Sequence, residues 1–488
     1  MTTTNPTATP EPRSGGWPDY RAVWRWHFYA GLLCIPFVIW LACTGSIYLF
    51  KPQVEAFIDR GTDRIVVAGP AASPSAQVAA AVAAVPGSAL ASYETPQAPG
   101  AAVRVLVSQG ADLTRVYVHP SSLEILKTVP EDDRFMEVVF RLHGELLAGE
   151  RGSNIVELAA CWAIVMILTG LFLWWPRQSS LAGVIYPRFH KGSRHVWRDL
   201  HAVTGFWVSL FAIFLLLTGL PWAKNWGGYF KEVRKVTGAT AAAQDWNTSR
   251  AEAAAQRRAD DAGVRATAAV VEDEHAQHNM AVAGGGGMHH HTPGMVMPGM
   301  APEDAYAPLD RVAPTIAALK LPPPVLISPP KTPGAPWTAK TDTPNRPQRV
   351  DFTVDGETGK LIGAKDFSQK HLIDKIVGVG IAAHEGQLFG WANQLLGLFT
   401  AIGLVLLSVS AVVLWWRRRS VGALGAPEAI ARPRLSVALV VIVLALGLYL
   451  PMFGVSLLTV LAVERLVLRR IPPVRDWLGL QRERPAKA

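Results

Sequence analysis

Charged residues are scarce in this chain of 488 residues. Asp, Glu, Lys and Arg make up 17% of the sequence, and hydrophobic residues make up 50%. This balance is too apolar for one soluble domain of that length and is typical of a polytopic membrane protein with soluble parts. The net charge of +9 comes from basic residues at the ends of apolar segments. Because they do not line one soluble face, no nucleic-acid-binding surface is predicted.

Cysteine is also rare, and several cofactor fingerprints are missing. The three cysteines, Cys34, Cys43 and Cys161, all fall in apolar segments, so no disulfide framework is expected. No C-x-x-C-H sequence occurs, which excludes covalently attached haem. The segments between the apolar runs carry no dinucleotide or flavin fingerprint. The apolar runs hold too few acidic residues for the cation path of a metal permease.

Long apolar segments are abundant, and each is near or above the ~20 residues that cross a ~30 Å hydrocarbon core. The expected spans are 27–50, 153–175, 203–223 and 392–416, followed by a C-terminal apolar segment at 435–470. This last segment has Pro451 in its middle and a basic end, which favours a hairpin over a single crossing, although both remain open.

The distribution of Lys and Arg predicts the orientation of the spans. Residues 1–26, 176–202 and 417–434 are expected in the cytoplasm, and 51–152 and 224–391 on the outer side. The side of the tail at 471–488 depends on whether the C-terminal segment is a hairpin or a single crossing. The first outer segment reads as α+β, with Ser73 capping a helix at about 75–85 and strands at 103–107, 115–119 and 124–129. The second ends in a hairpin of 349–354 and 360–363.

Two pairs of histidines each begin a pattern of residues that occurs twice in the chain. The residues that follow His27 and His201 at equal offsets are Gly31 and Gly205, Phe37 and Phe211, Leu41 and Leu215, and Thr44-Gly45 and Thr218-Gly219. Likewise His143 and His384 precede a glycine by six residues and a Trp-Trp pair by thirty-one. Duplication of a two-span unit is the simplest explanation. The expected fold is therefore a mainly α-helical integral membrane protein with a four-helix core and outer α+β domains.

The repeated histidines suit haem ligation. A haem b takes neutral imidazoles from two facing helices, so His27 with His201 on the cytoplasmic side and His143 with His384 on the outer side can hold two haems. The glycine four residues after each cytoplasmic-side histidine would let a flat macrocycle approach, and Arg25, Arg194 and Arg198 could meet the propionates. The alternatives are that single histidines merely sit at the lipid boundary, or that His195 replaces His201. The helix carrying each outer histidine is expected to turn at Gly149 or Gly390, because a continuous helix would be too long.

A tract rich in histidine and methionine surrounds Gly284–Gly287 in the second outer segment. Its candidate metal ligands are His275, His278, Met280, Met288, His289, His290, His291, Met295, Met297 and Met300. Thioether and imidazole together suit soft or borderline metals, above all Cu(I). The alternative is a linker of biased composition.

Three segments resemble the PepSY-associated transmembrane family. They read RLHGELLAG at 141–149, LTGLFLWWPR at 168–177 and LWWRRR at 414–419. The resemblance, which extends from about residue 21 to 420, implies a bacterial inner-membrane protein with periplasmic PepSY-like domains. Its characterised relatives look like siderophore-iron reductases with two b haems, so a ferric siderophore is the expected acceptor and quinol or a partner reductase the donor. A cupric reductase that uses the His/Met tract for Cu(II) and a haem-free PepSY regulatory membrane protein are the alternatives.

Overall fold

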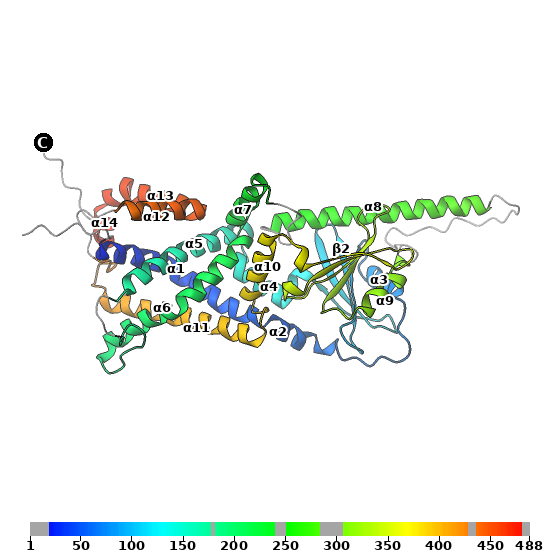
Figure 1. Ribbon diagram of the computed structural model, residues 1–488, viewed down its shortest axis with the longest axis horizontal. Helices are drawn as coiled ribbons and strands as arrows, with labels where there is room; N and C mark the ends of the chain where they lie inside the picture. Colours follow the sequence, from blue (N-terminus) through cyan, green and yellow to red (C-terminus); the bar gives the residue numbers. More distant parts are fainter. Residues whose placement is uncertain (1–18, 177–180, 240–249, 284–305, 428–435, 481–488) are drawn as a thin grey trace, which may run out of the picture. The chain divides into compact units, whose positions relative to one another are not determined.

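The computed structural model describes residues 19–176, 181–239, 250–283, 306–427 and 436–480 (Figure 1). Five of its helices are long and apolar enough to cross a membrane: Tyr20–Leu49, Gly149–Trp174, Gly192–Trp222, Trp391–Arg418 and Pro451–Arg470. The chain divides into two compact units. The first comprises the described residues within Met1–Ile39, Leu158–Ile213 and Gly403–Ala488, and the second those within Trp40–Glu157 and Phe214–Ile402.

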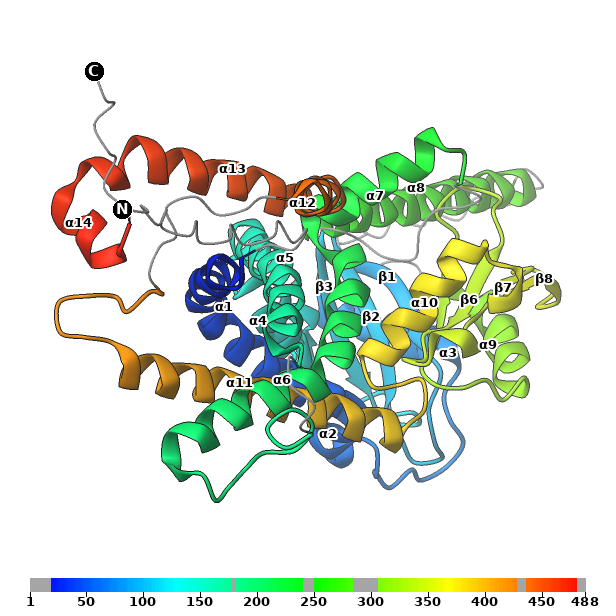
Figure 2. The ribbon, with the colours of Figure 1, turned by 60° about the vertical axis from the view of Figure 1, so that its left-hand side comes forward.

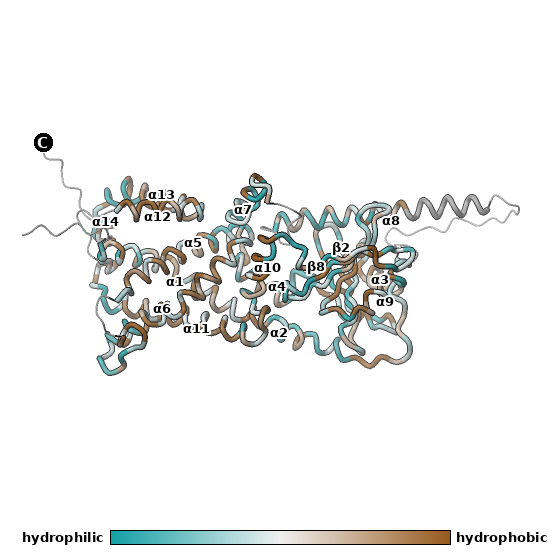
Figure 3. The backbone as a smooth tube through the Cα atoms, in the orientation of Figure 1, coloured by the Kyte–Doolittle hydropathy of each residue, from teal (hydrophilic) through white to brown (hydrophobic). Residues whose placement is uncertain are grey.

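Four long helices contribute residues to both units: α1 (Tyr20–Leu49), α5 (Gly149–Trp174), α6 (Gly192–Gly219) and α11 (Trp391–Arg418). Figure 3 shows that these helices are mainly hydrophobic, whereas the coloured part of α8 (Arg250–Ala283) is more hydrophilic. In a hydrocarbon environment every backbone polar group must be satisfied within the segment, and a helix meets this requirement. The chain is therefore a multi-pass membrane protein.

The C-terminal apolar segment is two helices, α12 (Val437–Tyr449) and α13 (Pro451–Leu466), joined by a sharp turn at Leu450. The helices touch at two glycines, because a Cβ atom added to Gly454 would lie 2.9 Å from the carbonyl oxygen of Gly447. At 1.5 Å per residue, the 13 residues of α12 span only about 20 Å, less than a hydrocarbon core. A short η7 (Leu468–Arg470) and α14 (Pro472–Leu478) follow.

The second unit contains one eight-stranded sheet in the order β4-β3-β2-β1-β5-β6-β7-β8, and every neighbouring pair is antiparallel. The strands are β1 (Ala89–Glu94), β2 (Val103–Gln109), β3 (Asp112–Val118), β4 (Ile125–Pro130), β5 (Val325–Ser328), β6 (Trp337–Thr341), β7 (Val350–Val354) and β8 (Leu361–Asp366). The two segments that the sequence places outside the membrane thus share one sheet, joined where Tyr93 and Glu94 of β1 pair with Ile327 and Leu326 of β5.

One face of the sheet forms the hydrophobic core with α3 (Pro74–Ala84) and α9 (Leu309–Ala318) (Figure 2). Val78 and Val312 of these helices pack against strand residues such as Val105 and Ile327, and all four are fully buried. The helix α3 begins where the sequence predicts, since the Ser73 hydroxyl accepts a hydrogen bond from the backbone N–H of Ala76.

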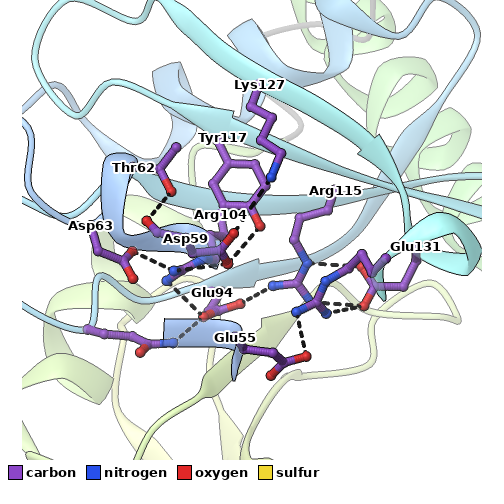
Figure 4. A network of polar contacts seen from close by, with 12 residues as sticks. Glu55, Asp59, Thr62, Asp63, Glu94, Arg104, Arg115, Tyr117, Lys127 and Glu131 are labelled. Carbon is purple, nitrogen blue, oxygen red and sulfur yellow. Dashed lines mark hydrogen bonds and ion pairs between the residues drawn. The ribbon is translucent and has the colours of Figure 1, made fainter. Parts of the chain in front are cut away.

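The opposite face carries a network of buried charges (Figure 4). Glu94 is 2% exposed and forms ion pairs with Arg104 at 3.5 Å and Arg115 at 2.6 Å. Arg104 also pairs with Asp63, which follows η1 (Asp59–Gly61). Arg115 also pairs with Glu131, the first residue of η2 (Glu131–Asp133). The network therefore fixes to the sheet both the chain that leaves α1 through α2 (Lys51–Ile58) and the chain that enters α4 (Phe135–Glu145).

Candidate functional site

Two short helices carry His143 and His384 ahead of the long ones. His143 lies in α4, which ends at Leu146 in a left-handed conformation with φ 51°, and His384 is the last residue of α10 (Leu372–His384). Positive φ angles also occur at Gly149 (57°), the first residue of α5, and at Gly390 (59°), directly before α11. Such angles are easy for glycine. The chain thus turns at the two glycines that the sequence singles out.

The four repeated histidines form two pairs of almost identical geometry, each within one unit. The rings of His27 and His201, the first histidine pair, have centroids 6.4 Å apart and planes at 80°. The rings of His143 and His384, the second histidine pair, lie at 6.4 Å and 81°. The structure therefore brings together the residues that the repeat matches. His195, the alternative to His201, is exposed.

A hydroxyl group meets the Nδ1 atom of each histidine. The Nδ1 atoms of His27, His143 and His384 lie 3.0 Å from the Oγ1 atoms of Thr169, Thr44 and Thr218, respectively. The Nδ1 atom of His201 lies 3.1 Å from the carbonyl oxygen of Leu407 and 3.2 Å from Oγ of Ser410. Each partner is on a long helix other than the one that carries the histidine.

These hydroxyls fix the proton of each ring on Nδ1. Every hydroxyl already donates its only hydrogen to a carbonyl in the preceding turn of its own helix, at 2.7–2.9 Å from Val165, Trp40, Phe214 and Leu407. It can therefore only accept from the imidazole, and Nδ1 must be the donor. The lone pair on Nε2 is then available to a metal, which is the arrangement that supporting hydrogen bonds give to metal-ligating histidines.

The histidines of the second pair are held in the neutral state that ligation requires. Burial lowers the pKa of His143 and of His384 to about 4. Both rings are therefore uncharged at neutral pH, and no proton has to be displaced from Nε2 when a metal binds.

The glycine that follows each threonine lets the histidine ring lie close to the facing helix. A Cβ atom at Gly170 would be 3.1 Å from Cε1 of His27, and one at Gly45 would be 3.1 Å from Cε1 of His143. At Gly219 the distance to Cε1 of His384 would be 3.4 Å. A side chain at the first two positions would press on the ring. By contrast, Gly31 and Gly205, four residues after the first-pair histidines, face Met166 and Leu407.

The donor set fits iron held in a macrocycle better than a bare ion. Two metal–nitrogen bonds of about 2 Å each, plus half an imidazole ring at either end, require ring centroids about 6 Å apart. The observed 6.4 Å matches this. Within the described residues, no group of three or more His, Cys, Asp or Glu could hold a metal ion. Two axial imidazoles are what a six-coordinate haem takes from a protein, because the porphyrin supplies the other ligands.

The hydroxyl partners have a signal in the sequence. Thr44 and Thr218 each follow their repeated histidine, His27 or His201, by 17 residues. Thr169 and Ser410 follow His143 and His384 by 26 residues. The spacing marks these residues as equivalent, but it cannot show that each one contacts a histidine of another helix.

Other residues proposed from the sequence have different surroundings. The guanidinium of Arg25 donates to backbone carbonyls of Pro427 at 2.6 Å and Gly479 at 3.0 Å. Arg198 pairs with Asp199 at 3.0 Å, and Arg194 is exposed. The structure thus uses Arg25 to hold the C-terminal segment.

The His/Met tract falls mostly outside the described residues. The backbone of α8 is described as far as Ala283, but its side chains from 271 onward are not, and neither are residues 284–305. The tract's candidate ligands, from His275 to Met300, therefore stay a prediction.

Comparison with known proteins identifies the family. No curated protein matches the chain. The sequence pattern described as the PepSY-associated TM region matches residues 24–418, a range that contains both histidine pairs, their hydroxyl partners and the whole sheet. The chain therefore belongs to the PepSY-associated transmembrane family.

Proposed function

We propose that this protein is a di-haem b electron carrier of the bacterial inner membrane that reduces a ferric siderophore or a similar metal complex. One observation carries the proposal: two histidine pairs share a 6.4 Å ring separation, and the Nδ1 atom of each histidine lies 3.0–3.1 Å from a hydroxyl or carbonyl oxygen on another helix. A haem b bound at each pair would supply one-electron redox chemistry. The resemblance to siderophore-iron reductases supports the acceptor.

The protein's own residues would orient and insulate the two redox groups. The threonine and serine hydroxyls keep each imidazole in the ligating tautomer, and the apolar helices exclude water from the pairs. Reduction of a ferric chelate is outer-sphere electron transfer, so no catalytic base is required. The donor would be quinol or a partner reductase, because no nicotinamide or flavin fingerprint occurs in the chain.

The orientation and the origin of the four-helix core belong to the same proposal. The basic residues of 176–202 and 417–434 support a cytoplasmic position for these loops. The sheet would then lie in the periplasm, where ferric complexes arrive. Equal offsets from histidine to hydroxyl, 17 and 26 residues in each half, support a duplicated two-span unit.

Cupric reduction is a second candidate, and it is favoured by the composition of the His/Met tract. The helix α8, which leads into the tract, is anchored to the sheet. Asp261 accepts hydrogen bonds from the Ser108 hydroxyl at 2.6 Å and from the Gly110 backbone N–H at 3.1 Å. A Cu(I)-binding segment would thus be tethered to the sheet of the second unit.

Anaerobic reoxidation tests the proposed activity. Purified protein reduced with dithionite should be reoxidised by a ferric siderophore, with the change followed in the haem absorption bands. In right-side-out vesicles the ferric complex should act from the periplasmic side. Protein that purifies without haem, or whose haem is inert to every ferric and cupric complex tried, would support the haem-free regulatory alternative.

A further inference from the structure

A row of three aromatic side chains lies beside the second histidine pair. The ring centroids of Tyr48 and Phe140 are 5.8 Å apart, and those of Phe140 and Trp222 are 5.7 Å apart. Tyr48 and Trp222 each follow by one helical turn a threonine that contacts a histidine of the pair, and Phe140 precedes His143 by three residues. Residues three or four apart share a helix face, so the row flanks the second pair.

A cation lies at each end of this aromatic row. The Nζ atom of Lys51 is 5.4 Å from the ring centroid of Tyr48, and the guanidinium carbon of Arg346 is 5.7 Å from that of Trp222. Burial opposes the charge on Lys51, but Tyr48, Glu55 and Glu385 raise its pKa above the ordinary value, so it stays protonated. Arg346 begins η5 (Arg346–Gln348), which packs against α10.

The indole of Trp222 points to the kind of ligand that the row would take. Its Nε1 atom is buried and has no hydrogen-bond partner among the described residues. A buried donor without a partner costs free energy, so such groups in proteins are normally satisfied by something. Arg346 already interacts electrostatically with the buried Glu385, whereas the indole N–H has no acceptor of its own among the described residues. A carboxylate oxygen beside the guanidinium suits that N–H.

We propose that Trp222 and Arg346 form a carboxylate-binding site beside the second histidine pair, and that Lys51 adds positive charge at the other end of the row. The inference rests on the proposed function, because the carboxylate would belong either to a propionate of a haem held by that pair or to a metal chelate that accepts its electrons. In either case the site neutralises negative charge next to the redox centre. It also satisfies the buried indole N–H.

Two substitutions test the site in haem-loaded, full-length protein. Trp222→Phe removes the N–H and keeps an aromatic ring, and Arg346→Gln removes the positive charge. Trp416→Phe is the matched control, because Arg419 lies 3.8 Å over that indole in the other unit. Haem content should be measured first, and both midpoint potentials by spectroelectrochemical titration. The concentration of ferric chelate that gives half-maximal reoxidation should then be compared for ferric citrate and for a ferric tris-hydroxamate, which lacks carboxylates.

The two sources of the carboxylate predict different results. If it is a propionate, the less neutralised charge favours ferric iron, and one of the two potentials should fall. A tenfold shift in the ferric/ferrous ratio corresponds to about 59 mV. If it belongs to the acceptor, both potentials should stay and the half-saturating concentration should rise several-fold for ferric citrate only. Variants that match wild type in all these measurements would overturn the site. A wild type without haem would instead overturn the proposed function and this inference with it.

Discussion

Replacing Thr218 by valine is the sharpest perturbation of the second histidine pair. The change keeps the shape of the side chain but removes the oxygen that lies 3.0 Å from Nδ1 of His384. The Nδ1–H group then loses its hydroxyl acceptor and keeps only the backbone carbonyl of Leu215 as a partner. Complete loss of the acceptor of a buried donor costs about 1–3 kcal/mol, which sets the upper bound of the effect. Loss of a supporting hydrogen bond to a metal-ligating histidine costs about 10–100-fold in affinity. The two estimates agree, since tenfold is about 1.4 kcal/mol.

The redox potential should change with the affinity. An acceptor on Nδ1–H makes the imidazole a stronger donor and favours the ferric state. Without it, the potential of one haem should rise, by about 60 mV if the ferric state is weakened tenfold relative to the ferrous state. Ser410→Ala should have a smaller effect on the first pair, because the Leu407 carbonyl still lies 3.1 Å from Nδ1 of His201.

Spectroelectrochemistry and haem retention after dilution in detergent would measure both effects. Thr218→Ser is the control, because it keeps the hydroxyl and should behave like wild type. The reasoning would be refuted if Thr218→Val and Thr218→Ser gave the same potentials and lost haem at the same rate.

Three further outcomes follow from the structure. His201→Ala should remove one haem and leave the other, whereas His195→Ala should remove neither; pyridine haemochrome assays would show the opposite pattern if His195 were the ligand. Deleting 275–300 should impair Cu(II)-driven reoxidation and leave ferric-siderophore turnover unchanged if the tract binds copper, and equal behaviour with copper would make it a linker. Burial alone would raise the pKa of Glu131, but the ion pairs with Arg115 and Arg134 lower it to about 2. The ionised carboxylate therefore stabilises the fold above pH ~4.5, and this contribution is lost as the pH falls from ~4.5 to 2. Acid unfolding of Glu131→Gln should lack that component.

Local patterns predicted much of the fold. The cap at Ser73, the strands β2, β3 and β4 and the hairpin of β7 and β8 lie where turn residues and alternating apolar residues place them. The sequence did not predict strand β1, because its Ala and Glu residues are poor strand formers. Its Glu94 is buried because Arg104 and Arg115 pair with it. The short strands β5 and β6 were not predicted either.

The sequence alone could not predict which distant strands and helices contact each other. The joining of β1 to β5 depends on contacts between residues more than 200 positions apart, and it turns two expected domains into one sheet. For the histidines, equal offsets in the two halves predicted which residues pair. The same offsets mark Thr44 and Thr218, but their contacts with His143 and His384 depend on how helices pack, and a helix pattern in one sequence does not specify its neighbour.

Counting the haems in purified protein tests the central claim most directly. The chain should be expressed in haem-replete cells, purified in detergent, and measured by pyridine haemochrome, iron analysis and low-temperature electron paramagnetic resonance. Two histidine pairs of equal geometry predict about two non-covalent b haems per chain, both six-coordinate and low-spin. A folded, colourless protein, or one with haem in a five-coordinate state only, would contradict the account.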